Sequence, residues 1–187
     1  MTSSNDSPPA QGVIYTMGCG DMFREHISRR CESLGVTYLV DVRSPPFDYS
    51  RKPLHPKPLS EYLAQREIRY VDMHERLGDR PMDLSLWVQQ GRTIDYERYA
   101  QRQSAQDELD RLVEAYNMGL RICVLDREAD ARKSHRARFI GYCLKQRGIH
   151  ARHLEPAGAW HSQEEIERIA GMLWKRSFRF SWVHKNH

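Results

Sequence analysis

The sequence contains no uninterrupted apolar run of about 18 residues, the length that a membrane-spanning helix needs. Its first residues are polar and have neither the basic start nor the apolar stretch of a secretory signal peptide. Cysteine is scarce, and the four cysteines include no Cys-x-x-Cys pair, so neither a zinc ribbon nor a thioredoxin-type dithiol is expected. These absences predict a cytoplasmic protein with reduced thiols and no membrane partner.

An excess of charge of one sign is also missing. Lys and Arg number 29 and Asp and Glu number 25, so the formal net charge at pH 7 is only +4. This excess permits an anionic partner, such as a phosphorylated small molecule or a nucleic acid, without requiring one. The nine histidines include no His-Glu-x-x-His or comparable ligand spacing, so we expect neither a metal nor another cofactor.

The chain does contain enough hydrophobic residues for a core. They make up 40% of the 187 residues, which suits one ordinary domain and leaves no room for a second core. We expect this domain over residues 12–176, between a disordered tail over residues 1–11 and an aromatic and basic tail over residues 177–187. The aromatic and basic tail would either stack on nucleic-acid bases or dock on its own domain.

Short apolar runs alternate with helical patterns along this domain. Strand patterns cover residues 13–17, 36–42, 68–73, 120–125 and 149–154. Helical patterns cover residues 22–34, a short stretch from Pro58, and about 94–118, 134–147 and 164–176, with Asp21 as the cap of the first. The alternation predicts an α/β fold: a three-layer, Rossmann-like domain whose mostly parallel sheet has about five strands.

Polar and basic residues follow three of the predicted strands. Gly18-Cys19-Gly20 follows the first strand, Asp41, Arg43 and Ser44 follow the second, and Asp126 and Ser134-His135-Arg136 follow the fourth. Ligands of open parallel sheets bind beyond the carboxyl ends of the strands. We therefore expect these segments to converge on one site, with Arg43 and Arg136 on the same side of the sheet.

Ser134-His135-Arg136 opens a predicted helix. A helix start favours anions because its N–H groups are unpaired and its dipole end is positive. Ser134 would cap the helix, and Arg136 would add a bidentate contact to a phosphate or carboxylate. The simpler alternative is a plain serine cap followed by solvent-exposed His135 and Arg136.

The other segments have structural alternatives too. Gly18-Cys19-Gly20 would let the backbone approach a phosphate, or it is only a tight turn between strand and helix. Asp41 would orient Arg43 for catalysis, or pair with it to close the strand end. Cys19 is better placed for reactivity than Cys123, whose apolar strand indicates a buried structural thiol.

Eight short motifs follow one another along the chain: Ile14-Tyr15-Thr16-Met17-Gly18, Asp41-Val42-Arg43-Ser44-Pro45, Ile68-Arg69-Tyr70, Leu77-Gly78, Tyr96 to Ala100, Cys123, Ser134-His135-Arg136, and Arg147-Gly148 to His153-Leu154. In this order they resemble a bacterial family called domain of unknown function 488, over about residues 13–155. The resemblance implies a Rossmann-like α/β fold. This chain has Ser134 where the family usually has Cys, Leu125 where it usually has Glu, and Cys19 where it usually has His or a similar residue.

We therefore predict an enzyme or ligand-binding protein that acts on a phosphorylated ligand, such as a nucleotide or nucleic acid, through an anion site at the carboxyl edge of the sheet. The predicted binding residues are Gly18, Arg43, Ser44, Ser134 and Arg136. The candidates for acid, base or nucleophile are Asp41, Cys19, Asp126 and His135. The alternatives are a non-catalytic nucleic-acid-binding module and an accessory subunit that has lost the family activity.

Overall fold

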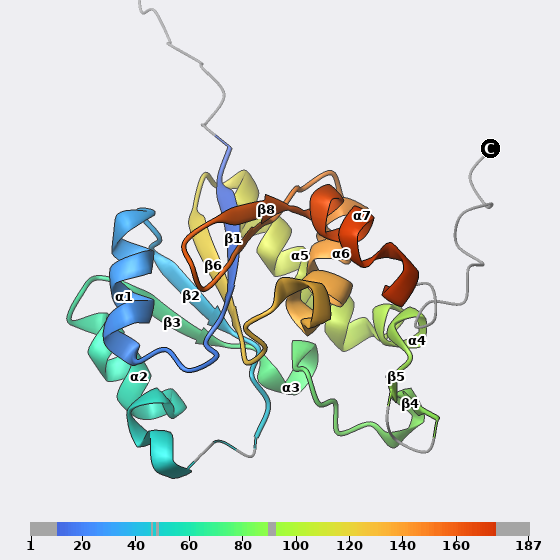
Figure 1. Cartoon of the computed structure of the whole chain (residues 1–187), viewed down its shortest axis with the longest axis horizontal. Coiled ribbons are helices and arrows are strands. Elements are labelled where there is room, and N and C mark those ends of the chain that lie inside the picture. Colours follow the sequence, from blue (N-terminus) through green and yellow to red (C-terminus); the bar gives the residue numbers. More distant parts are fainter. Residues whose placement is uncertain (1–10, 46, 48, 90–92, 175–187) are drawn as a thin grey trace, which may run out of the picture.

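A six-stranded sheet forms the centre of the molecule (Figure 1). The computed structural model describes residues 11–45, 47, 49–89 and 93–174. The strands are β1 (Val13–Gly18), β2 (Tyr38–Asp41), β3 (Arg69–Asp72), β6 (Arg121–Asp126), β7 (Arg152–Leu154) and β8 (Trp160–Ser162). Their order in the sheet is β3-β2-β6-β1-β7-β8. The strands from β3 to β7 in this order pair in parallel, and β8 pairs antiparallel with β7.

Helices cover both faces of this sheet (Figure 1). α1 (Arg24–Ser33) and α2 (Pro56–Ala64) lie over one face, and α5 (Gln103–Asn117), a π-helix over Arg136–Gly141 and α6 (Tyr142–Lys145) lie over the other. α7 (Gln163–Trp174) packs on the π-helix and on the short 3₁₀ helix η3 (Ala131–Lys133). The predicted three-layer, Rossmann-like α/β fold is thereby confirmed, with β8 as an additional edge strand.

Two hydrophobic cores, one on each side of the sheet, follow from the alternation of side chains along the strands. Tyr15, Met17 and Leu39 face α1 and α2 together with Cys123 and Leu125. Their sequence neighbours face the opposite core, which contains Ile14, Val40, Ile122 and Val124. Each buried strand is therefore apolar on both faces, as expected for a parallel sheet between two helical layers.

The predicted helix over residues 94–118 is two helices, α4 (Tyr96–Ala100) and α5. The backbone at Arg102 is extended, with φ −70° and ψ 127°, and this redirects the chain between them. The redirection lets Tyr96 and Tyr99 of α4 stack on Phe139 of the π-helix, at ring centroid distances of 5.5 and 4.5 Å. Aromatic packing between distant segments therefore overrides the continuous helical pattern.

Other differences concern short elements. The hairpin of β4 (Trp87–Val88) and β5 (Thr93–Ile94) was not predicted, because two-residue strands give no measurable alternation. α1 begins at Arg24 and is not capped by Asp21, because the amide of Met22 donates to the carbonyl of Cys19 and closes a turn there. The short helices η1 (Tyr49–Leu54) and α3 (His74–Leu77) were not among the predicted helices.

Residues 1–10 and 175–187, which hold both predicted tails except Gln11, lie outside the described residues. Within the described ranges, no helix combines the length and the apolar character needed to span a bilayer.

Candidate functional site

Polar side chains meet at the carboxyl ends of β1, β2 and β3, on the face covered by α1 and α2. Arg43 Nε donates to Asp41 Oδ1 at 2.9 Å, and Arg43 Nη2 donates to Asp41 Oδ2 at 2.5 Å and to the carbonyl of Leu54 at 2.9 Å. The hydroxyl of Tyr70 donates to Asp41 Oδ2 at 2.7 Å. The Cys19 thiol lies against the Arg43 guanidinium. We call Cys19, Asp41, Arg43 and Tyr70 the sheet-edge site.

Protonation in this site follows from burial and from the Asp41–Arg43 pair. Burial raises the pKa of the Cys19 thiol, although the charges of Arg43 and Arg51 act in the opposite direction. Burial and the Asp41 carboxylate raise the pKa of Tyr70. Burial alone would lower the pKa of Arg43, but its hydrogen bonds to Asp41 raise it. At neutral pH the site therefore contains a charged guanidinium, a protonated phenol and a protonated thiol.

Arg51 and Phe47 flank the site. The Arg51 guanidinium donates to the carbonyls of Gly20 and Met22, so it ties η1 to the turn that follows β1. The Phe47 ring centroid lies 5.7 Å from the guanidinium carbon of Arg43. Arg51 and Tyr70 were not predicted as site residues, because Tyr70 lies inside a predicted strand and Arg51 lies eight residues after Arg43.

The predicted residues after β6 lie on the opposite face of the sheet. Thr16 lies between Tyr15 and Met17, which face α1 and α2, so Thr16 points toward the π-helix. The buried Arg136 Nε donates to Thr16 Oγ1 at 3.2 Å, Nη2 donates to the carbonyl of Ala129 at 3.1 Å, and Nη1 donates to the carbonyl of Glu128. These contacts correct the prediction that Arg136 and Arg43 hold one anion from the same side, because Arg136 binds the chain's own oxygens.

Ser134 and His135 are also structural. Ser134 Oγ accepts from the amide of Ala137 at 3.3 Å, so the predicted serine cap is present. His135 is buried, with Nε2 2.9 Å from the carbonyl of Leu77 and Nδ1 3.3 Å from the Tyr96 hydroxyl. Burial lowers its pKa, so the ring is neutral and donates through Nε2. His135 is therefore neither the predicted proton carrier nor the solvent-exposed residue of the alternative interpretation.

Three further candidates hold the loops together. Asp126 Oδ1 accepts from the amide of Arg127 at 2.5 Å, and Oδ2 accepts from the amide of Arg136 at 3.2 Å. A Cβ on Gly18 would lie 1.9 Å from the carbonyl oxygen of Glu128, so only glycine permits this close approach. Ser44 Oγ accepts from the amide of Arg80 at 3.1 Å. Of the nine predicted residues, Cys19, Asp41 and Arg43 thus remain as the chemically distinctive cluster.

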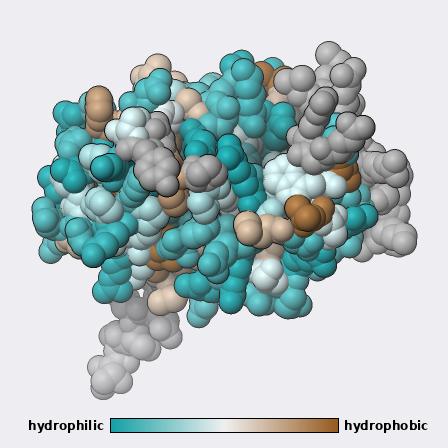
Figure 2. All heavy atoms as spheres, turned by 90° about the horizontal axis from the view of Figure 1, so that it is seen from below, coloured by the Kyte–Doolittle hydropathy of each residue, from teal (hydrophilic) through white to brown (hydrophobic). Residues whose placement is uncertain are grey.

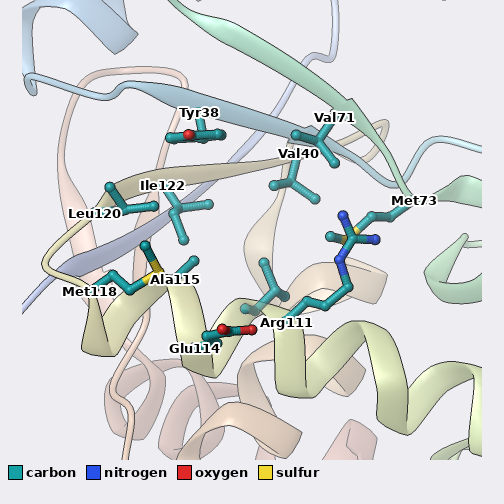
Figure 3. A pocket seen from close by; sticks show the side chains of 11 residues that line it. Tyr38, Val40, Val71, Met73, Arg111, Glu114, Ala115, Met118, Leu120 and Ile122 are labelled. Carbon is teal, nitrogen blue, oxygen red and sulfur yellow. The ribbon is translucent and has the colours of Figure 1, made fainter.

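A cavity of about 290 Å³ lies between the sheet and α5 (Figure 3). It is lined mainly by apolar side chains from β2, β3, β6 and α5, with Arg111 and Glu114 as its charged residues. It opens on the opposite face from the sheet-edge site, and no pair of acid–base groups converges in it. Within the described ranges, no group of three or more His, Cys, Asp or Glu side chains is arranged to hold a metal ion.

The parallel strands end on the side of the molecule from which Figure 2 is drawn. Most of the visible surface there is hydrophilic, with small hydrophobic areas (Figure 2).

Three of the sequence motifs, those that contain Ser44, Leu77 and His135, contact one another at the carboxyl edge of the sheet. His135 Nε2 donates to the carbonyl of Leu77, and a Cβ on Gly78 would lie 2.2 Å from Ser44 Oγ. The amide of Ser44 donates to Asp79 Oδ1 at 2.8 Å. The Leu77-Gly78 loop is therefore packed between the segments that follow β2 and β6.

A family model described as domain of unknown function DUF488 matches residues 24–143, which is more than half of the chain. No curated protein and no solved structure matches. The matched segment includes the motifs that begin at Asp41, Leu77 and Ser134, whereas β1 and β7 lie outside it. Both the match and the fold agree with the resemblance in the sequence, and the chain belongs to the family of domain of unknown function DUF488.

Proposed function

We propose that this protein binds a phosphorylated ligand, such as a nucleotide or the end of a nucleic acid, at the sheet-edge site. One observation carries the proposal: an Asp41-bound Arg43 guanidinium, a thiol and a phenol meet at the carboxyl ends of three neighbouring strands. This is where open α/β sheets bind their ligands. Arginine suits phosphate because its planar group donates several parallel hydrogen bonds.

Arg43 is buried and held in place, and two of its donors are not bound to any oxygen of the described residues. Three of its five N–H groups are used, two on Asp41 and one on the carbonyl of Leu54. The two N–H groups of Nη1 reach no oxygen in the part of the chain that the structure describes. Because Asp41 and Leu54 already fix the guanidinium, a phosphate oxygen would bind there without ordering a mobile side chain.

Arg51 supplies the charge that favours an anion over a neutral ligand. Asp41 neutralises Arg43, whereas the contacts of Arg51 within the described ranges are carbonyl oxygens. Its charge reaches the site, since it acts to lower the pKa of Cys19. Arg51 therefore places a positive charge next to Cys19, which favours a phosphate at that position.

Binding is the part of the prediction that this geometry supports. Both carboxylate oxygens of Asp41 accept hydrogen bonds, so Asp41 orients Arg43 and is not positioned to transfer a proton. A protonated Cys19 thiol is a poor nucleophile, because the thiolate is the reactive form. We therefore propose Cys19 as a residue that contacts the ligand.

The test measures thermal unfolding and calorimetric binding with inorganic phosphate, nucleotides, sugar phosphates, and short single-stranded DNA and RNA. A compound at 100 times its Kd adds about 2.7 kcal/mol of stability to the folded state. We expect one phosphorylated compound to stabilise the wild type and Arg51→Gln to weaken its binding about tenfold, since the positive charge next to Cys19 is lost and a tenfold change in Kd corresponds to about 1.4 kcal/mol.

The matched control is Arg168→Gln, which removes the same charge from an exposed position on α7. Affinity unchanged in this variant would show that the loss in Arg51→Gln is local. Binding of polynucleotides alone, weakened equally by both substitutions and abolished by salt, would favour the non-catalytic nucleic-acid-binding module. Absence of binding by every compound would contradict the proposal.

A further inference from the structure

Strands β2 and β3 end in the same local structure. Asp41 and Asp72 are partners in the parallel register, and Arg43 and His74 follow them two residues later. Asp41 Oδ1 accepts from the amide of Arg43 at 3.0 Å and from its Nε at 2.9 Å. Asp72 Oδ1 accepts from the amide of His74 at 3.1 Å and pairs with its Nδ1 at 2.5 Å. Each aspartate thus holds the side chain two residues beyond it.

The two turns bring His74 to the sheet-edge site. Asp41 and Asp72 both act on Tyr70, whose pKa they raise. The Phe47 ring lies 5.7 Å from the Arg43 guanidinium carbon and 6.4 Å from the His74 ring centroid. Phe47 therefore contacts both Arg43 and His74, so the Asp72–His74 pair and the sheet-edge site border the same aromatic ring.

Asp72 fixes the tautomer of His74. A carboxylate within hydrogen-bond distance of Nδ1 keeps the proton on that nitrogen and leaves the lone pair on Nε2. Nε2 has no hydrogen-bond partner in the residues that the structure describes, and the side chain is 24% exposed. An imidazole oriented by a carboxylate through Nδ1 is the arrangement by which hydrolases accept a proton on Nε2.

The predicted proton carriers, by contrast, are already bound. Asp41 accepts from Arg43 and Tyr70, and Asp126 accepts from two backbone amides. His135 is buried and hydrogen-bonded through both ring nitrogens. His74 differs from all three in combining solvent access, an oriented ring and an unbound nitrogen.

The geometry points to His74 as the general base of a phosphomonoester hydrolase, with Asp72 as its positioning residue; this inference rests on the proposed phosphate binding. His74 Nε2 takes a proton from water as the water oxygen forms a bond to phosphorus. The bond between phosphorus and the ester oxygen breaks, and the alcohol leaves with a proton from solvent. The products are the alcohol and inorganic phosphate, while Asp72 stabilises the imidazolium and Arg43 holds the phosphoryl oxygens.

The experiment measures phosphate release from p-nitrophenyl phosphate, nucleoside monophosphates and sugar phosphates. We expect His74→Ala to lower kcat about 10²- to 10⁴-fold, the usual contribution of a general base. Inorganic phosphate should bind that variant with nearly unchanged affinity, because Arg43 and Arg51 remain. Added imidazole should restore part of kcat in His74→Ala, which a structural role for His74 would not predict.

A matched control is available at the opposite edge of the sheet. His150 Nδ1 lies 2.6 Å from Glu164 Oε1, so it forms the same kind of carboxylate pair, but it precedes β7. His150→Ala should leave kcat and KM unchanged. Asp72→Asn should lower kcat with little change in KM, and Asp72→Glu should recover part of that loss, because only the orientation of His74 has changed.

The failures of the two proposals are distinguishable. A wild type that binds phosphate but hydrolyses none of the esters would overturn the role of His74 and leave the binding site intact. Full kcat in His74→Ala would do the same. A wild type that binds no phosphorylated compound would overturn the binding site as well.

Discussion

Replacing Arg136 with methionine is expected to lower the free energy of unfolding by about 3–5 kcal/mol, the cost of removing one partner of a buried ion pair. Arg136 is fully buried, and its Nη1 lies 3.6 Å from Asp126 Oδ2. The substitution leaves the Asp126 carboxylate without its counter-charge. It also removes hydrogen bonds from Thr16 and from two carbonyls of the loop after β6. Methionine preserves much of the apolar part of the side chain, so the loss of unfolding free energy comes mainly from the guanidinium charge and its hydrogen bonds.

Urea unfolding at pH 7 measures this loss. Arg132→Met is the control, since Arg132 is an exposed arginine four residues earlier that pairs with Asp130, and its midpoint should hardly move. Adding Asp126→Asn to Arg136→Met should recover part of the lost stability, because an amide is cheaper to bury than an unpaired charge. A stable Arg136→Met variant that no longer binds phosphate would contradict this structural role and restore Arg136 to the anion site.

Acidification from pH 6.5 to pH 4 is expected to remove about 3 kcal/mol of stability through His153 alone. Burial, with a further contribution from the charge of Arg136, lowers the pKa of His153 to about 4. The unfolded chain therefore binds this proton at higher pH than the folded chain. The stabilisation is complete above pH 6.5 and is lost as the pH falls through the folded value.

The hydrogen bonds of His153 explain why its neutral form is the folded one. Gln163 Nε2 donates to the carbonyl of Ala137 at 3.2 Å and to Glu167 Oε1 at 3.0 Å, so its oxygen Oε1 faces His153 as an acceptor. The neutral ring therefore carries its proton on Nε2, and the Thr16 hydroxyl donates to Nδ1 at 2.8 Å. His153 Nε2 then donates to Gln163 Oε1 at 2.7 Å. A second ring proton on Nδ1 would meet the Thr16 hydroxyl proton and add a charge beside Arg136.

The measurement is urea unfolding at pH 7, 6, 5 and 4.5 for the wild type and His153→Gln. The variant should be less stable at pH 7 but should lose less stability on acidification. The unfolding free energy of the variant should still fall with decreasing pH, because burial also lowers the pKa of His135 and this residue acts in the same direction. An identical pH dependence of the unfolding free energy in the two proteins would show that the pKa of His153 is not lowered in the folded state.

The fold was predictable because its signals are local. The apolar strands over Val13–Gly18 and Arg121–Asp126 and the amphipathic helix ending at Asn117 each show their own periodicity. The break between α4 and α5 had no local signal, since it serves the stacking of Tyr96 and Tyr99 on Phe139. β8 was missed because a three-residue edge strand shows too little alternation.

The candidate site was predictable only in part. Cys19, Asp41 and Arg43 were identified because they follow the strands whose carboxyl ends carry the ligand in this type of fold. Tyr70, Arg51 and the Asp72–His74 pair were not, although Asp72-x-His74 repeats the spacing of Asp41-x-Arg43. That repetition becomes informative only when β2 and β3 are known to be register partners.

The sequence by itself determined that polar residues gather at one edge of a parallel sheet, because strands and helices alternate and each strand ends in polar residues. The tertiary structure decided which of these residues share a face. Side chains alternate between two faces along every strand, and the strand order and crossovers place one helical layer on each face. Arg43 therefore meets Cys19 and Tyr70, whereas Arg136 lies among Thr16, Asp126 and His153 on the other side, where its donors hold the loop in place.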